Sequence, residues 1–255
     1  MESSSWAQSI IIAAVPQPYS YVVFEWNHKP HQLLIPPSYV RYWEVTERAE
    51  SELNALIGAR GALVGFARLP QKLLAARSGL ARYGKNNIAY VPEFGSHHML
   101  VSFYSSLPCV EETWAEPLML ESCRRCTACL RACPSQAIGK DSFVIRQDRC
   151  ITFYSGYSGQ QDFPGWLKPE WIECLIGCRK CQVVCPANGK FRSRPPAVEE
   201  SFSEEETGIL RDGPGSGKLP AALRRKLDRL GLIRFFGLSE CLEMLKKKLS
   251  LLLGD

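Results

Sequence analysis

Apolar and polar positions alternate in short blocks over the first 108 residues. Apolar runs at 9–15 and 20–35 predict strands, and the polar turn from Asn27 to Pro30 divides the second run into a hairpin. Residues 39–57 carry Glu and Arg on one face and apolar side chains on the other, which predicts a helix that ends at Gly58. The further elements expected here are strands at 61–67, 88–92 and 98–105 and a helix at 71–78. This alternation predicts an α/β layer domain over residues 1–108.

The pattern changes after residue 108. Residues 109–190 contain few long apolar runs, which is typical of a small domain in which metal replaces part of the core. Residues 191–218 are rich in Pro, Ser, Gly and Glu and indicate a linker or wrapping arm. Two short amphipathic helices are expected near 219–231 and 238–253, so that residues 191–255 form a linker followed by a helical tail.

Most of the eleven cysteines fall into two runs within residues 109–190. The first run is Cys123-x2-Cys126-x2-Cys129-x3-Cys133-Pro134, and the second is Cys178-x2-Cys181-x3-Cys185-Pro186. The first spacing is that of bacterial ferredoxins, in which three cysteines bind one 4Fe–4S cluster and the fourth binds another. The spacing therefore predicts two clusters. Cluster 1 is bound by Cys123, Cys126, Cys129 and Cys185, and cluster 2 by Cys133, Cys178, Cys181 and one further ligand.

Two cysteines compete for the last position on cluster 2. Cys150, which follows the segment SFVIRQDR, is the first candidate, and Cys174, in the spacing Cys174-x3-Cys178, is the second. Cys109 and Cys241 are expected to be small buried apolar side chains. The alternative for the whole set is a pair of structural zinc sites, but the x2-x2-x3-Pro spacing favours iron–sulfur.

The composition limits the size of the core, the kind of partner and the cellular location that we expect for the protein. The 255 residues are 45% apolar, which is enough for one large core or two small ones. The formal charge is +5, and two oxidised clusters at about −2 each offset most of it, so that basicity gives little support to a nucleic-acid partner. The apolar run at 10–15 is too short for a signal peptide or a membrane span. We therefore expect a cytoplasmic protein without membrane association, whose cysteines are metal ligands.

At these residues the chain resembles the epoxyqueuosine reductase family, which are cobalamin-dependent iron–sulfur enzymes related to reductive dehalogenases. The similarity covers residues 70–190 and includes the loop from Ser78 to Asn86, Gly95-Ser96, and the segments CRRCTACLRACPSQAI, DRCITFY and GCRKCQVVCPAN. The resemblance implies the same seven ligands as the spacing, and it selects Cys150 over Cys174 as the eighth. It also implies a corrinoid-reductase-like α/β layer domain at 1–108, followed by a bacterial-ferredoxin-like dicluster domain at 109–190.

In such enzymes a Gly-rich loop and the α/β layer hold a base-off corrinoid beside one cluster. Glycines let the backbone approach a large planar ring, and the polar side chains of the loop bond its amide rim. Without the resemblance, an ordinary connection between two strands explains the segment as well as corrinoid contact does. The loop positions that the resemblance assigns to the corrinoid are Gly79, Arg82, Tyr83, Gly84, Lys85 and Asn86.

The chain also departs from the family pattern. The 65 residues after position 190 are too few for the three or more helical repeats of a tRNA-binding tail, so a short paralogue is expected and tRNA is disfavoured as a partner. The catalytic general-acid Asp of the family aligns, without gaps, with Glu44 (RYWEVTER). Glu44 is therefore the candidate catalytic residue, and its alternative is a solvated glutamate on a helix face.

Together these features predict an iron–sulfur oxidoreductase that passes low-potential electrons through two clusters to a corrinoid, cobalamin, for reductive chemistry. The expected partner is an external electron donor such as ferredoxin or flavodoxin. The alternative is an electron-transfer or activating protein that reduces the corrinoid of a partner protein and has no substrate site of its own. A further alternative is a cobalamin-free dicluster ferredoxin fused to a remnant domain.

Overall fold

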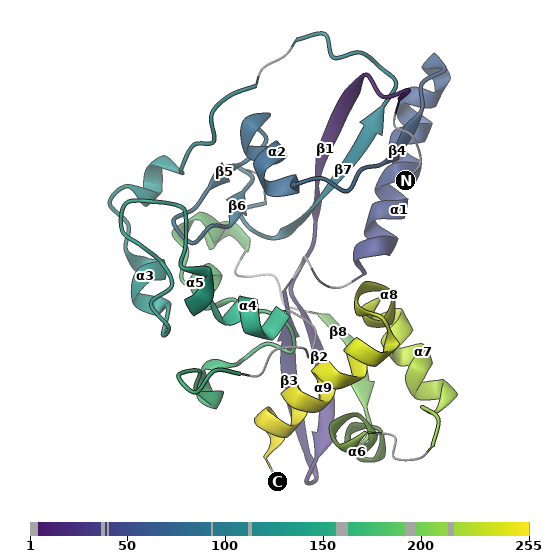
Figure 1. Cartoon of the computed structure of the whole chain (residues 1–255), viewed down its shortest axis with the longest axis vertical. Helices are drawn as coiled ribbons and strands as arrows, with labels where there is room; N and C mark the ends of the chain where they lie inside the picture. The colour runs from purple at the N-terminus through teal and green to yellow at the C-terminus, as the bar shows by residue number, and fades with distance from the viewer. Residues whose placement is uncertain are drawn as a thin grey trace.

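A computed structural model describes residues 5–36, 39, 41–92, 94–111, 114–156, 163–191, 197–213 and 217–254. Within these residues the fold is mixed α/β, with two three-stranded sheets and a two-stranded ribbon (Figure 1). The expected α/β class is thereby confirmed. Across the described residues, every helix falls short of the length and apolarity that a membrane crossing requires.

The first sheet is antiparallel and has the strand order β1-β7-β4. Strand β1 spans Ser9–Pro16, β7 spans His98–Ser105 and β4 spans Val64–Phe66. Helices α1 (Tyr42–Ile57) and α2 (Gln71–Arg77) pack on it. All five elements lie where the sequence predicted them, although β4 and α1 are shorter than expected. Residue 40, within the predicted start of α1, lies outside the described residues.

The two faces of β7 bury different helices, because successive side chains of a strand point to opposite sides. Met99, Val101 and Phe103 form one core cluster with side chains of α1. Leu100 belongs to a separate cluster that includes Ala75 of α2. The run Met-Leu-Val in β7 is therefore fully apolar because helices cover both faces of this strand.

The second sheet joins the N-terminal hairpin to a late segment of the chain. Strands β2 (Ser20–Trp26) and β3 (Lys29–Ile35) form the expected hairpin, and β8 (Ala197–Phe202) pairs with β2 in parallel. Asn27 and His28 have φ of 50° and 58°, the left-handed conformations that a tight two-residue hairpin turn requires.

Residues 191–218, which the sequence predicted to be a linker or wrapping arm, form a strand and a helix in the part that the structure describes. This segment contains β8 and helix α6 (Glu204–Asp212), and residues 192–196 and 214–216 lie outside the described ranges. Ser203 and Glu206 form a capping box at the start of α6, in which each side chain accepts a hydrogen bond from the backbone N–H of the other residue. The polar composition of the segment therefore comes from a helix cap and an exposed edge strand.

The C-terminal helices cover this second sheet. Apolar side chains of β2 and β3, among them Val22, Phe24 and Ile35, share a core with Leu227 and Leu249 of the tail. The hairpin thus lies within the first expected domain by sequence but packs with the last part of the chain, and the three-domain division itself stays a prediction. The helices are α7 (Ala221–Arg229), α8 (Leu232–Phe236) and α9 (Leu238–Leu253).

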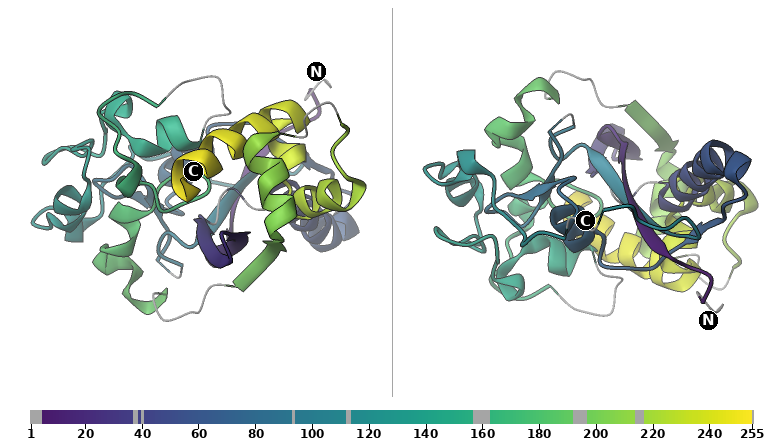
Figure 2. Two further views of the ribbon diagram at one scale, coloured as in Figure 1. Left: turned by 90° about the horizontal axis from the view of Figure 1, so that it is seen from below. Right: turned by 90° about the horizontal axis from the view of Figure 1, so that it is seen from above.

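The cysteine-bearing segment consists mainly of loops and short helices, which lie beside the ribbon of β5 and β6 (Figure 1). Both views of Figure 2 place α9 against this segment, where Leu251 and Leu252 pack on Ile151, Leu167 and Ile172. The remaining elements are β5 (Arg82–Tyr83), β6 (Ala89–Tyr90), α3 (Ala128–Ala132), α4 (Ile151–Gly156), α5 (Lys180–Val183), and 3₁₀ turns at Gly58–Arg60, Glu121–Cys123, Gln147–Arg149, Pro169–Trp171 and Pro186–Phe191.

Candidate functional site

Four cysteines from two distant parts of the sequence surround one small cavity, which we call the cluster-1 cavity. Cys123 lies in the 3₁₀ turn before α3, Cys129 lies in α3, and Cys185 lies in the turn after α5. Lys85 and Asn86, from the Gly-rich loop, line the same cavity. The cysteines are Cys123, Cys126, Cys129 and Cys185, the four that the sequence assigned to cluster 1.

A second set of cysteines surrounds another small cavity, the cluster-2 cavity. It consists of Cys133, Cys150, Cys178 and Cys181, the four that the sequence and the family resemblance assigned to cluster 2. The competitor Cys174 is fully buried and does not line this cavity. The structure therefore groups the eight cysteines as predicted, while their role as ligands stays a prediction.

The thiols are held in a poorly hydrated setting. Burial raises the pKa of Cys123 and Cys129, raises that of Cys178 to about 11, and raises that of Cys181 further. Metal-free thiols of this kind are protonated at neutral pH, so that metal binding must release protons. Among the described residues, no three His, Cys, Asp or Glu side chains form a group that could hold a single metal ion, and the cysteines instead ring their cavities.

Asn86 separates the two cysteine cavities, since its side chain lines both of them. Its Nδ2 donates a hydrogen bond to the Tyr90 hydroxyl over 2.9 Å, and its amide also hydrogen-bonds Cys181. Tyr90 in turn hydrogen-bonds Cys185, a cysteine of the other set. A Cβ on Gly84 would lie 2.5 Å from Asn86 Oδ1 and 2.6 Å from the Tyr90 ring, which explains the glycine at this position.

Lys85 reaches across from the same loop to hold the backbone around cluster 1. It is 4% exposed, and its Nζ donates to the carbonyl oxygens of Arg124 and Cys126 over 3.3 and 3.1 Å. These two carbonyls belong to the turn that carries the first cysteines of the set. The loop therefore supports the cysteine cavities directly.

A buried polar network fixes the segment around the second cysteine run. Asn188 Oδ1 accepts from the Ser96 backbone N–H over 2.8 Å, while Asn188 Nδ2 donates to Ser96 Oγ over 2.8 Å. Ser96 Oγ donates to Gln182 Oε1 over 3.0 Å. Gly95 has φ of 58°, and a Cβ there would lie 2.4 Å from Asn188 Oδ1. This network accounts for the Gly95-Ser96 pair that the sequence comparison singled out.

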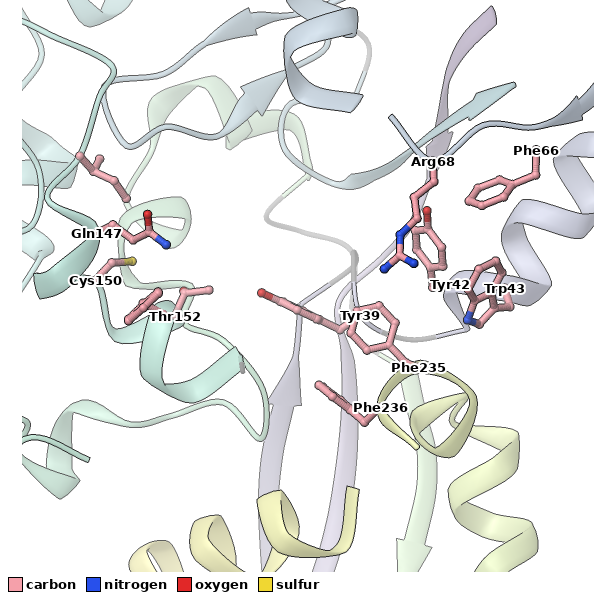
Figure 3. A pocket seen from close by; sticks show the side chains of 12 residues that line it. Tyr39, Tyr42, Trp43, Phe66, Arg68, Gln147, Cys150, Thr152, Phe235 and Phe236 are labelled. Atoms are coloured by element: carbon pink, nitrogen blue, oxygen red, sulfur yellow. The ribbon is translucent and has the colours of Figure 1, made fainter. Parts of the chain in front are cut away.

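A much larger cavity of about 650 Å³ opens on the other side of cluster 2 (Figure 3). In Figure 3, Cys150, Gln147 and Thr152 lie on one side of it, and Arg68 points into it from the opposite side. Cys150, Ile145 and Thr152 also line the cluster-2 cavity, so one short wall separates the two spaces. The remaining lining residues are Tyr39, Tyr42, Trp43, Phe66, Phe153, Phe235 and Phe236.

None of the six loop residues assigned to a corrinoid lines this large cavity. Lys85 and Asn86 face the cysteine cavities, and the Tyr83 ring stacks on Phe143 with the centroids 4.6 Å apart. Arg82 is exposed, Gly84 accommodates the Asn86–Tyr90 pair, and Gly79 turns the chain after α2 with φ of 79°. Their contact with a corrinoid stays a prediction.

Glu44 lies in the first turn of α1 and does not line the large cavity. Its side chain is 67% exposed and its Oε2 lies 3.8 Å from Arg41 Nε. The neighbouring residue Trp43 is the one that faces the cavity. The catalytic role of Glu44 stays a prediction, and the structure places the residue on the solvated helix face that was its alternative.

Sequence reasoning missed the aromatic wall of the large cavity. Tyr42 and Trp43 come from α1, Phe66 from β4, and Phe235 and Phe236 from α8. In its local sequence, each aromatic residue resembles an ordinary core or surface position. No spacing in the sequence indicates that these three segments meet. Only the packing of α8 beside α1 brings them together.

The sequence matches a family model described as a 4Fe-4S double cluster binding domain over residues 122–188. Epoxyqueuosine reductase from Synechococcus sp. (strain CC9605) is 33% identical to it over 172 residues, which are 64% of this chain and 52% of that protein. Epoxyqueuosine reductase from Bacillus subtilis (strain 168) is 31% identical over 138 residues, which are 54% of this chain and 34% of that protein.

Solved structures of similar fold agree with these matches. A structure of epoxyqueuosine reductase from Bacillus subtilis superposes with a TM-score of 0.65 and 21% identity, over 98% of this chain and 65% of that one. An epoxyqueuosine reductase bound to an epoxyqueuosine-modified tRNA-Tyr stem loop gives a TM-score of 0.65 and 19% identity, with the same coverage. The chain spans about half the length, or less, of the relatives that match it in sequence.

Proposed function

The chain belongs to the epoxyqueuosine reductase family, and on that premise we propose that it is an oxidoreductase whose two 4Fe–4S clusters deliver electrons to an acceptor in the large cavity. One observation carries this proposal: Cys150 lines both the cluster-2 cavity and the large cavity. An acceptor bound there lies beside a cluster ligand, with no further layer of protein between them.

The arrangement of the cavities gives the electron path a direction. Asn86 is shared by the two cysteine cavities, and Cys150 is shared by the second of these and the large cavity. The order is therefore cluster 1, cluster 2, acceptor. An external low-potential donor protein, such as ferredoxin or flavodoxin in the cytoplasm, reduces cluster 1, which lies at the far end of this order.

The large cavity suits a corrinoid as the acceptor. A planar macrocycle needs broad apolar walls and polar partners at its amide rim, and the cavity offers seven aromatic side chains together with Arg68 and Gln147. In this assignment Trp43, Phe66 and Phe235 would contact the ring, while Arg68 and Gln147 would bond its rim. A bound corrinoid supplies a strongly reducing cobalt centre, which suits reductive removal of oxygen or halogen from a small molecule.

The test is a cobalamin titration of the anaerobically purified protein with both clusters assembled, followed by absorbance. Trp43 lines the cavity, whereas Trp114 is an exposed tryptophan that does not. We expect binding of about one cobalamin per chain, a Kd at least tenfold weaker in Trp43→Ala because an aromatic wall is lost, and an unchanged Kd in Trp114→Ala. Two intact clusters without any cobalamin binding would overturn the proposal and favour the electron-transfer protein that reduces a partner.

A further inference from the structure

Lys248 of α9 is a buried lysine close to the second cysteine set. It is 1% exposed, its Nζ donates to Ser155 Oγ, and it lies 5.3 Å from the centroid of the Phe163 ring. Ser155 Oγ donates in turn to the carbonyl oxygen of Gly177 over 2.9 Å. Gly177 directly precedes Cys178, so this chain of hydrogen bonds connects the C-terminal helix to the cluster-2 loop.

A buried ammonium group needs a counter-charge. Burial lowers the pKa of Lys248 to about 8, and the charges of Cys174 and Cys178 oppose that shift. Among the described residues, no carboxylate lies within ion-pairing distance of Lys248. The nearby Lys180, by contrast, pairs with Glu173 at 3.4 Å. Because an unpaired buried charge is costly, the counter-charge available to Lys248 is negative charge at the neighbouring cysteines, which are Cys174 and, from the cluster-2 set, Cys178.

Lys85 has the same relationship to the first cysteine set. It is also buried, it lines the cluster-1 cavity, and its charge opposes the burial that raises the pKa of Cys123. Its ammonium group donates to two backbone carbonyls, and no carboxylate among the described residues lies within ion-pairing distance of it. Within the part of the chain that the structure describes, each cysteine set therefore has a buried lysine beside it, contributed by an element outside the cysteine-bearing segment.

We propose that Lys85 and Lys248 are positioning residues for the two clusters, each of which raises the reduction potential of the cluster beside it. Reduction by one electron adds one negative charge to a cluster, and a fixed cation nearby stabilises the reduced form in a medium of low dielectric constant. This inference rests on the proposed function, because it requires that the eight cysteines hold two redox-active clusters.

The experiment is a potentiometric titration of the full chain with both clusters assembled, monitored by electron paramagnetic resonance. We expect Lys248→Met to lower one midpoint potential and Lys85→Met to lower the other, each by at least a tenfold change in the reduction equilibrium, which is 59 mV for a one-electron couple. Lys248→Arg keeps the positive charge, so we expect its midpoint potential to stay close to that of the wild-type protein. Lys246→Met is the matched control, because Lys246 is exposed on the same helix, and it is expected to move neither potential.

The outcomes separate this inference from the function on which it rests. If iron and sulfide analysis of the wild-type protein shows no pair of 4Fe–4S clusters, the proposed function itself is wrong. If both clusters are present and neither lysine variant moves a potential, or each variant moves both potentials equally, the inference is wrong while the function stands. Lys248→Gln and Lys85→Gln, measured in parallel, give the same readout with a polar neutral side chain wherever the methionine variant fails to fold.

Discussion

The Asn86 side chain donates a hydrogen bond to the Tyr90 hydroxyl over 2.9 Å, and Asn86 lines both cysteine cavities. Asn86 contacts Cys181 on one side, and Tyr90 contacts Cys185 on the other. The resemblance to corrinoid enzymes assigned Asn86 to a corrinoid, whereas its contacts in the fold are with the cysteines.

Replacing Asn86 by leucine, which has a similar volume, removes a donor from both Cys181 and Tyr90. Hydrogen bonds to cluster sulfurs raise the reduction potential, so we expect the potential of cluster 2 to fall in a redox titration. The buried Tyr90 hydroxyl also loses its amide donor, which is expected to lower the free energy of unfolding by about 1–3 kcal/mol. Asn87→Gly, which keeps the φ of 61° accessible, is the control for the redox titration, and an equal fall in the cluster-2 potential of that variant contradicts the assignment.

The choice between Cys150 and Cys174 is decided by metal content. Cys150→Ser is expected to reduce the assembled protein from about eight iron atoms per chain toward about four, because cluster 2 loses a ligand. Cys174→Ser is expected to keep all of them, since Cys174 lies outside the cluster-2 cavity. Iron and sulfide analysis measures both variants, and loss of a cluster in Cys174→Ser instead would reverse the ligand assignment.

His98 gives the fold a dependence on pH. Burial lowers its pKa to about 4, so the imidazole stays neutral in the folded protein while the unfolded chain takes up a proton below about pH 6.5. Its contribution to stability is therefore fully present above pH 6.5 and declines as the pH falls toward 4. Between pH 8 and pH 5 we expect a loss of about 2 kcal/mol in urea unfolding that is absent in His98→Gln. Identical pH profiles for the two proteins would rule this out.

Removal of the capping box at Ser203 tests whether residues 197–212 are structured. Ser203→Ala removes the oxygen that accepts from the Glu206 backbone N–H, and we expect the free energy of unfolding to fall by about 1 kcal/mol. Ser201→Ala, at an exposed position two residues earlier, is the control with little expected change. Equal stability of the two variants in urea unfolding would indicate that α6 contributes nothing to the fold.

Local sequence patterns were sufficient for the early strands and for the proximity of the closely spaced cysteines. The strand at 9–15, the hairpin at 20–35 and the helix ending near Gly58 all follow from periodicity and turn residues, and the structure contains them. The spacing of Cys123, Cys126 and Cys129 fixes three thiols within one turn and a short helix, so their proximity needs no tertiary information.

Long-range packing accounts for what the sequence patterns did not reveal. The composition of residues 191–218 predicted a linker or wrapping arm and did not reveal the regular elements, because a capped helix and an edge strand are rich in the same polar residues as a linker. The resemblance assigned the Gly-rich loop to a corrinoid, and that contact stays a prediction. In the fold, the side chain that approaches Gly84 most closely is Asn86.

The sequence by itself determined that the cysteines of each closely spaced run lie near one another, since chain connectivity limits where a thiol two or three residues away can lie. Only the tertiary structure decided that Cys150 faces a large aromatic cavity as well as its own set, because that cavity is built from α1, β4 and α8, which are far apart in the chain. The same packing brings Lys248, from the last helix, beside the cluster-2 loop. Lys248 and Cys178 are 70 residues apart in the chain, so their proximity leaves no pattern in the sequence. The charge of Lys248 acts strongly on the cluster-2 loop because the residue is buried beside it, and burial depends on the tertiary structure.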